Sequence, residues 1–248
     1  QRQGDDALVS QQDPQGQGRV WPQTINVRVG SVDASEIYTI ELGEKPQRLV
    51  GAGEKDFILP NGSGLEYGNF LLDQASRSYL IENISNLESA LLRGAAWVTL
   101  WDQLLEGYLA PSVFTNTLLK ALPIEQDELI VARLLGYLSN VYWDYGGVEE
   151  RKTLGLKIES ILWSQVNSDR SRSARSAFYA SYRQLALSDE AVDRLERLWR
   201  GDESVDGLPL SETEQIALAS GLALKGLSTA EEVLDQQRQR ITNPDRLA

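Results

Sequence analysis

The basic, serine-rich stretch of the sequence surrounds residue 170. Its members are Arg170, Arg172, Arg175, Ser168, Ser171, Ser173 and Ser176. Because the planar donors of an arginine match a carboxylate or a phosphate, this stretch could hold a phosphate or the carboxylate of a peptide. A solvated helix start with Asp169 as its cap explains the same residues, and the net charge of −12 favours that simpler interpretation.

Two groups of aromatic residues could line a binding site. Tyr142, Trp143 and Tyr145 stand beside a pair of glycines, where the end of a helix could open a pocket. Trp97 and Trp101 are four residues apart, so one helical face could present both rings to a ligand. Packing in the hydrophobic core is the favoured interpretation of both groups.

Four acidic pairs come at or near expected helix starts. They are Asp127-Glu128, Glu149-Glu150, Asp189-Glu190 and Glu231-Glu232. A catalytic pair of carboxylates would need a pocket built from separate elements. Because the helix dipole stabilises negative charge at a helix N-terminus, favourable placement on the helices is the preferred explanation.

The absence of histidine and cysteine excludes several kinds of active site. No Ser-His-Asp triad, cysteine nucleophile, disulfide or zinc site of the usual kind can form within this chain. The 24 basic and 36 acidic residues argue against nucleic acid as a partner. No run of about 18 apolar residues predicts a membrane span. We therefore predict no catalytic residue, metal ligand or cofactor in this chain.

The first 60 residues predict a small β-domain. Residues 24–29 and 38–42 alternate polar and apolar side chains, which is the pattern of half-buried strands. Residues 7–9, 47–50 and 57–59 predict three further short strands. Because no helix separates the strands, we expect a short antiparallel sandwich or sheet, truncated at the edge near Gln1.

Residues 61–248 predict a second, helical domain, in which apolar residues recur with a period of 3.6. The expected helices span 73–83, 85 or 86 to 107, 111–122, 123–146, 149–166, 169–186, 189–200, 211–225 and 229–241. Short linkers favour antiparallel pairs, stacked in a superhelix of the HEAT or armadillo kind. The predicted fold class is mostly α with a small β part, a β-sandwich followed by this helical stack.

Several segments follow one another in a recognisable order. They are 19–23 (RVWPQ), 59–70 (LPNGSGLEYGNF), 73–76 (DQAS), 92–107 (LRGAAWVTLWDQLLEG) and 237–246 (QRQRITNPDR). Their order, across most of residues 7–248, resembles the β-sandwich and C-terminal helical domain of zinc aminopeptidases of the aminopeptidase N family. The family's zinc motif, H-E-x-x-H with a distant glutamate, and its G-x-M-E-N strand are absent, because the sequence contains neither histidine nor methionine.

The resemblance implies that the parent protein, in the cytoplasm or the periplasm, removes N-terminal residues from peptides with zinc as its cofactor. This chain would be the sandwich and a shortened helical domain, without the catalytic domain. Its implied role is to cap the active site and limit substrate access, with the catalytic domain and peptide substrates as its partners. The candidates for peptide contact are Arg170, Arg172, Arg175, Tyr142 and Tyr145.

Two other functions stay open. The chain could be a free-standing helical-repeat scaffold that binds a protein or peptide on its concave face, in which case a start codon would lie near Gln1. It could also be an enzyme that uses carboxylates alone, whose hydrolytic activity would survive a strong chelator.

Overall fold

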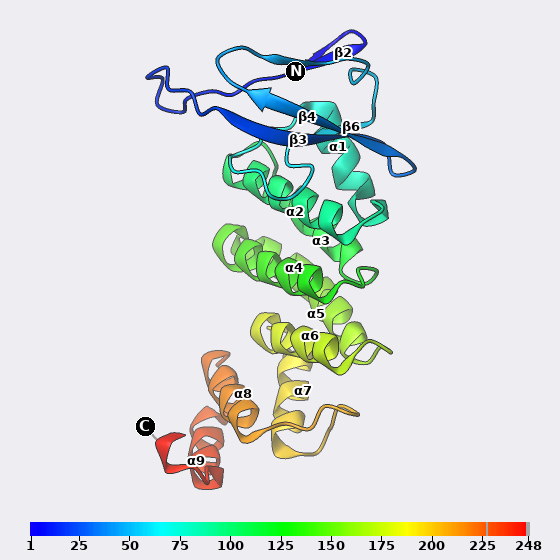
Figure 1. Cartoon of the computed structure of the whole chain (residues 1–248). Coiled ribbons are helices and arrows are strands. Elements are labelled where there is room, and N and C mark those ends of the chain that lie inside the picture. Colours follow the sequence, from blue (N-terminus) through cyan, green and yellow to red (C-terminus); the bar gives the residue numbers. More distant parts are fainter. Residues whose placement is uncertain (227, 247–248) are drawn as a thin grey trace. The chain divides into compact units, whose positions relative to one another are not determined.

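The computed structural model describes residues 1–226 and 228–246. Short strands come first and helices follow, so the protein is mostly α-helical with a small β part (Figure 1). The chain divides into two compact units, Gln1–Ile130 and Val131–Ala248. The change from strand to helix falls between Leu59 and Gln74, inside the first unit. The domain boundary predicted at residue 60 stays a prediction.

The strands form two antiparallel sheets of three strands each within the described residues. One sheet has the order β1 (Arg2–Gln3), β2 (Asp6–Val9), β5 (Gln47–Leu49), and the other has the order β4 (Ser35–Leu42), β3 (Gln23–Gly30), β6 (Phe57–Leu59). In β3 the side chains of Ile25, Val27 and Val29 are buried, and Val27 lies opposite Tyr38 of β4. The alternating pattern that predicted these strands is therefore confirmed.

Both sheets contribute to one apolar cluster. Its buried members are Ala7, Ile25, Val27, Val29, Leu42, Leu49, Ala52 and Ile58. Burial of such side chains is the main favourable term in folding, and here it links residues from the two sheets. The strands thus share a core although each sheet is small.

The junction between β6 and α1 (Gln74–Asn83) is held by polar side chains. Asp73 caps the helix by accepting a hydrogen bond from the backbone N–H of Ser76, 3.1 Å away. The Ser76 hydroxyl is buried and accepts the backbone N–H of Ile58 at 2.9 Å. Arg2 donates from Nε to Oδ1 of Asp73 at 2.9 Å and from Nη1 to the carbonyl of Gly53 at 2.8 Å. The helix start, the last strand and the first strand therefore meet at one place.

The turn before this helix requires a glycine. A Cβ at Gly62 would lie 2.5 Å from the backbone nitrogen of Arg28 and 2.6 Å from the carbonyl oxygen of Asn26. Glu66 completes the turn, because Oε1 accepts the Ser63 hydroxyl at 2.6 Å and the Asn26 backbone N–H at 3.0 Å. The segment predicted as a turn cluster is thus fastened to strand β3.

The remaining helices lie close to their predicted positions. They are α2 (Ala90–Leu105), α3 (Pro111–Ala121), α4 (Glu128–Asn140), α5 (Val148–Val166), α6 (Arg172–Leu185), α7 (Asp189–Arg200), α8 (Glu212–Leu224) and α9 (Ala230–Arg240). A π-helical turn, Val141–Tyr145, separates α4 from α5, and 3₁₀ turns occupy Ile84–Asn86 and Pro244–Arg246. Helix α5 packs against α6, and α8 packs against both α7 and α9.

Three predicted helix starts, those of α2, α6 and α4, are wrong. In each case the hydrogen bonds of a polar side chain fix the backbone just before the helix, so the helix begins later than predicted. Helix α2 begins at Ala90, not at residue 85 or 86, since Ser89 accepts the backbone N–H of Leu92 as the cap. Helix α6 begins at Arg172, because the cap is Ser171, not Asp169.

Helix α4 begins at Glu128, although Pro123 and Glu125 predicted an earlier start. The carboxylate of Glu125 accepts the backbone N–H groups of Gln126 and Asp127, each at 2.9 Å, which keeps this segment out of the helix. The acidic pairs do lie at helix starts, with Glu128, Glu149, Glu150, Asp189, Glu190, Glu231 and Glu232 in first turns. Their expected placement is confirmed. Within the described ranges, no helix has the length and apolar content to cross a membrane.

We expect Gly94→Ala in α2 and Gly221→Ala in α8 each to raise the free energy of unfolding by about 0.5–1 kcal/mol, because alanine favours a helix over glycine. A Cβ at either position meets no atom within 4 Å. Chemical denaturation of the 248-residue chain measures the change. Gly62→Ala is the control and should destabilise the chain, because its Cβ would collide with backbone atoms. A loss of stability in both helix variants would contradict this account.

Candidate functional site

Two of the three predicted arginines near residue 170 bind other parts of the same unit. Arg170 donates from Nε to Oε1 of Gln165 at 2.7 Å, and its guanidinium carbon lies 5.4 Å from the ring centre of Phe178. Arg175 donates from Nε to the carbonyl of Val166 at 2.7 Å and from Nη2 to the carbonyl of Asp206 at 2.6 Å. Both side chains thus fasten α6 to neighbouring segments.

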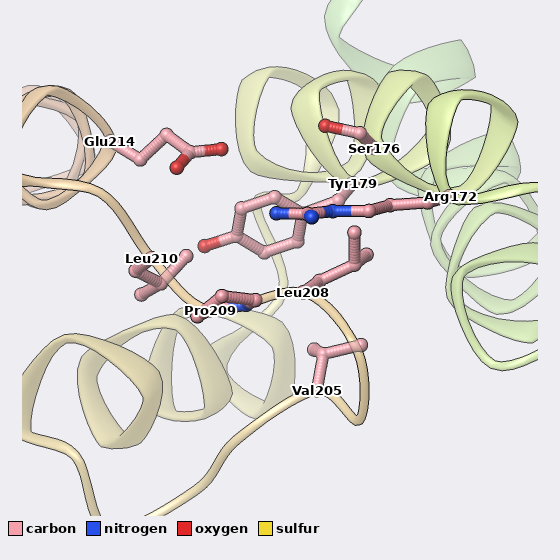
Figure 2. Close-up of a pocket in the computed structure, with 8 residues that line it drawn as sticks. All are labelled: Arg172, Ser176, Tyr179, Val205, Leu208, Pro209, Leu210 and Glu214. Carbon is pink, nitrogen blue, oxygen red and sulfur yellow. The ribbon is translucent and has the colours of Figure 1, made fainter.

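The third arginine, Arg172, lines a pocket beside α6, with a cavity volume of about 50 Å³ (Figure 2). Residues Arg172, Ser176 and Tyr179 follow each other by four and three positions, so they lie on one face of this helix. Glu214 from the first turn of α8 and a wall from the segment between α7 and α8 complete it. The wall consists of Val205, Leu208, Pro209 and Leu210.

The hydroxyl of Tyr179 is the buried polar group of this pocket. The residue is 4% exposed, and its oxygen has no hydrogen-bond partner among the described residues. Burial raises the pKa of Tyr179 to about 12, so the hydroxyl remains a protonated donor at neutral pH. In Figure 2 the hydroxyl end of the ring points to the side of the pocket where Leu210 and Glu214 lie.

Glu214 presents one carboxylate oxygen that its own helix does not use. Its Oε2 accepts the backbone N–H of Ser211 at 2.8 Å and the Ser211 hydroxyl at 2.7 Å, which completes a capping box. These hydrogen bonds, together with the charges of Arg183 and Arg172, hold the pKa of Glu214 below its ordinary value. The pocket therefore carries a carboxylate and a guanidinium group at neutral pH.

The aromatic cluster near residue 142 lies in the π-helical turn Val141–Tyr145 and does not line the pocket beside α6. Tyr142 is buried, and its ring contacts Trp143 edge to face, with centroids 5.0 Å apart. Its hydroxyl faces Gly155, where a Cβ would lie 3.5 Å from the oxygen. Burial raises the pKa of Tyr142 as well. Tyr145 is 42% exposed.

The tryptophan pair in α2 is packed against α3. Trp97 is 1% exposed and meets Phe114 edge to face, with ring centroids 5.8 Å apart. Trp101 is half-buried and lies 5.7 Å from the same ring. The interpretation of Trp97 as a core residue is confirmed.

Sequence reasoning found Arg172 and Ser176, which belong to the basic stretch, but missed Tyr179 and Glu214. Tyr179 carried a usable signal, because its spacing from Arg172 and Ser176 places all three on one helical face. Glu214 carried no sequence signal, since its position beside Tyr179 and Arg172 depends on how α8 packs near α6. The five predicted peptide-contact residues are not gathered into this pocket, which Arg172 alone among them lines.

Among the described residues, no group of three or more histidine, cysteine, aspartate or glutamate side chains is placed to hold a metal ion. The sequence contains no histidine, so this chain cannot supply an H-E-x-x-H zinc motif. A scan against models of protein families finds no match for the chain, and a search among curated proteins finds none either.

Proposed function

We propose that the chain is the non-catalytic C-terminal part of a zinc aminopeptidase of the aminopeptidase N family. In that enzyme it caps the active site and limits which peptides enter, while another part of the parent protein supplies the zinc ligands. A cap of this kind excludes water from the reacting groups and selects substrates by their length.

The observation that carries the proposal is the junction between β6 and α1. Two of the segments on which the resemblance rests, 59–70 and 73–76, are the residues that join the strands to the helices. Asp73 caps α1, the Ser76 hydroxyl binds the last strand, and Glu66 fastens the turn to β3. Matching residues with such defined structural roles support a shared architecture more strongly than matching surface residues would.

Two further observations support the expected fold of such a C-terminal region. The apolar cluster shared by the two sheets supports a β-sandwich. In the second unit, the packing of α5 on α6 and of α8 on α7 and α9 supports successive helix pairs of the HEAT or armadillo kind.

The test uses the coding sequence upstream of the Gln1 codon and the full-length protein that it encodes. We expect an H-E-x-x-H motif with a downstream glutamate, and release of N-terminal residues from peptides that a zinc chelator abolishes and added zinc restores. The 248-residue chain alone should release none. A start codon near Gln1 without a zinc motif would contradict the proposal and favour the free-standing scaffold. Hydrolysis that survives the chelator would favour a carboxylate enzyme.

The peptide-contact role of the predicted residues is tested in the same full-length enzyme. We propose that Arg172 and Tyr145, whose side chains reach the surface, contact the peptide. The double variant Arg172→Ala/Tyr145→Ala should change the ratio of kcat/KM for long and short peptides by about threefold or more. Lys152→Ala, an exposed change on α5, is the control. An unchanged ratio would show that these two residues do not contact the peptide.

A further inference from the structure

The pocket beside α6 contains a buried donor that no described residue uses. Buried polar groups are nearly always hydrogen-bonded, because leaving one without a partner lowers stability. The Tyr179 hydroxyl is such a group, and it lies in a cavity of about 50 Å³, not within tight packing. A ligand atom that accepts a hydrogen bond in this cavity would satisfy it.

Opposite charges also face this cavity. Arg172 comes from α6 and Glu214 from α8, and no ion pair within 4 Å joins them in the described structure. Oε2 of Glu214 is taken by Ser211, while Oε1 can accept a further donor. The positive charge of Arg183 also stabilises the charged form of this carboxylate. A single anion would meet the repulsion of Glu214, and a single cation would meet that of Arg172.

We propose that this pocket binds a free α-amino acid with a small apolar side chain. The α-carboxylate accepts hydrogen bonds from the Tyr179 hydroxyl and the Arg172 guanidinium group. The α-ammonium group donates to Glu214. The inference does not depend on the aminopeptidase proposal, because it concerns groups of this chain alone and is measured on this chain.

The size and lining of the pocket match such a ligand. One buried water needs roughly 10–15 Å³, so a cavity of 50 Å³ accepts the few non-hydrogen atoms of glycine or alanine. Val205, Leu208 and Leu210 supply the apolar wall for a methyl side chain. A peptide fits less well, because a cavity of about 50 Å³ is too small for its additional atoms.

The experiment titrates the 248-residue chain with L-alanine and follows binding by calorimetry and by chemical-shift changes. We expect saturable binding with a dissociation constant of about 1–10 mM, as suits a ligand of so few atoms. N-acetylalanine and alaninamide each lack one charge and should bind at least about tenfold more weakly. Acetate, ethylamine and dialanine should also bind at least about tenfold more weakly than L-alanine.

Two tyrosine variants on the same helix separate binding from stability. Tyr179→Phe removes the unpartnered hydroxyl, so it should leave the melting temperature unchanged or higher and weaken alanine binding about tenfold to a hundredfold. Tyr182→Phe is the matched control, because the Tyr182 hydroxyl accepts a hydrogen bond from Arg194 Nη1 at 3.2 Å. It should lower the melting temperature without changing the dissociation constant. Arg172→Gln should weaken binding as Tyr179→Phe does.

Two results would overturn the inference. One is the absence of saturable alanine binding at roughly 50 mM, well above the expected range. The other is alanine affinity that is equal to that of acetate or ethylamine, or unchanged in Tyr179→Phe. In either case the cavity holds water, which would then be the partner of the Tyr179 hydroxyl.

Discussion

Glu125→Ala should lower the free energy of unfolding of the chain by about 3 kcal/mol or more, because it leaves a buried arginine without its counter-charge. Arg93 binds Glu125 with two parallel hydrogen bonds, from Nε to Oε2 at 2.8 Å and from Nη2 to Oε1 at 2.9 Å. The side chains are 16% and 3% exposed. Arg93 also donates to the carbonyl of Leu87 at 3.1 Å, so it cannot turn to solvent without losing a second contact.

Acid should remove part of this stabilisation. Burial of Glu125 disfavours its charged form, but the hydrogen bonds from Arg93 and from the backbone outweigh that effect and hold the pKa below its ordinary value. A lowered folded-state pKa gives stability that is present above the unfolded pKa and lost as the pH falls through the folded one. The stability difference between the wild type and Glu125→Gln should therefore be largest near neutral pH and shrink below about pH 4.

Urea denaturation at neutral and acidic pH measures both effects. Glu149→Ala is the control, since the Glu149–Lys152 pair is 85% and 68% exposed and should contribute almost nothing to stability. A loss of less than about 1 kcal/mol in Glu125→Ala would mean that Arg93 finds another partner or reaches water. A pH-independent difference would contradict the lowered pKa.

Trp97→Ala should lower the free energy of unfolding by about 3–5 kcal/mol, the usual effect of removing a buried aromatic side chain. Trp97 is 1% exposed, and Phe114 against it is fully buried. The loss has two parts. One is the free energy of transferring the buried indole from water to the core, and the other is the cost of the cavity left beside Phe114.

Two variants separate the possible origins of this effect. The indole Nε1 of Trp97 has no hydrogen-bond partner among the described residues, so Trp97→Phe keeps most of the packing and should be much milder. Trp101→Ala removes a half-buried ring, so its loss of stability should lie between those of Trp97→Phe and Trp97→Ala. Thermal and chemical denaturation measure the stability of the three variants. If Trp101→Ala proves the most harmful, the core of the first unit does not depend on Trp97.

Local patterns predicted most of the elements. The alternation in β3 and the 3.6-residue period of the helices depend on neighbours in the chain, so a single sequence reveals them. The start of α4 was missed because Glu125 is held by Arg93, 32 residues earlier, and no local rule contains that contact.

The candidate site shows the same limit. Arg172 was visible in a basic stretch of the sequence. Tyr179 is a binding candidate because its buried hydroxyl has no hydrogen-bond partner among the described residues, and only the packed structure can show this. Conversely, Arg170 and Arg175 looked equivalent to Arg172 but bind Gln165 and backbone carbonyls. Residue type and spacing proposed the region, and tertiary contacts distinguished its members.

The contacts of Arg2 have a consequence for the synthesis of the chain. Its partners Asp73 and Ser76 lie 71 and 74 residues later in the sequence. A ribosome adds about 5–20 residues per second, so the first strand waits several seconds before these partners exist. Until then, the edge of the first sheet has no helix to bind, and Arg2 lacks its two side-chain partners. The sheets should therefore reach their final stability only after the start of α1 has left the exit tunnel.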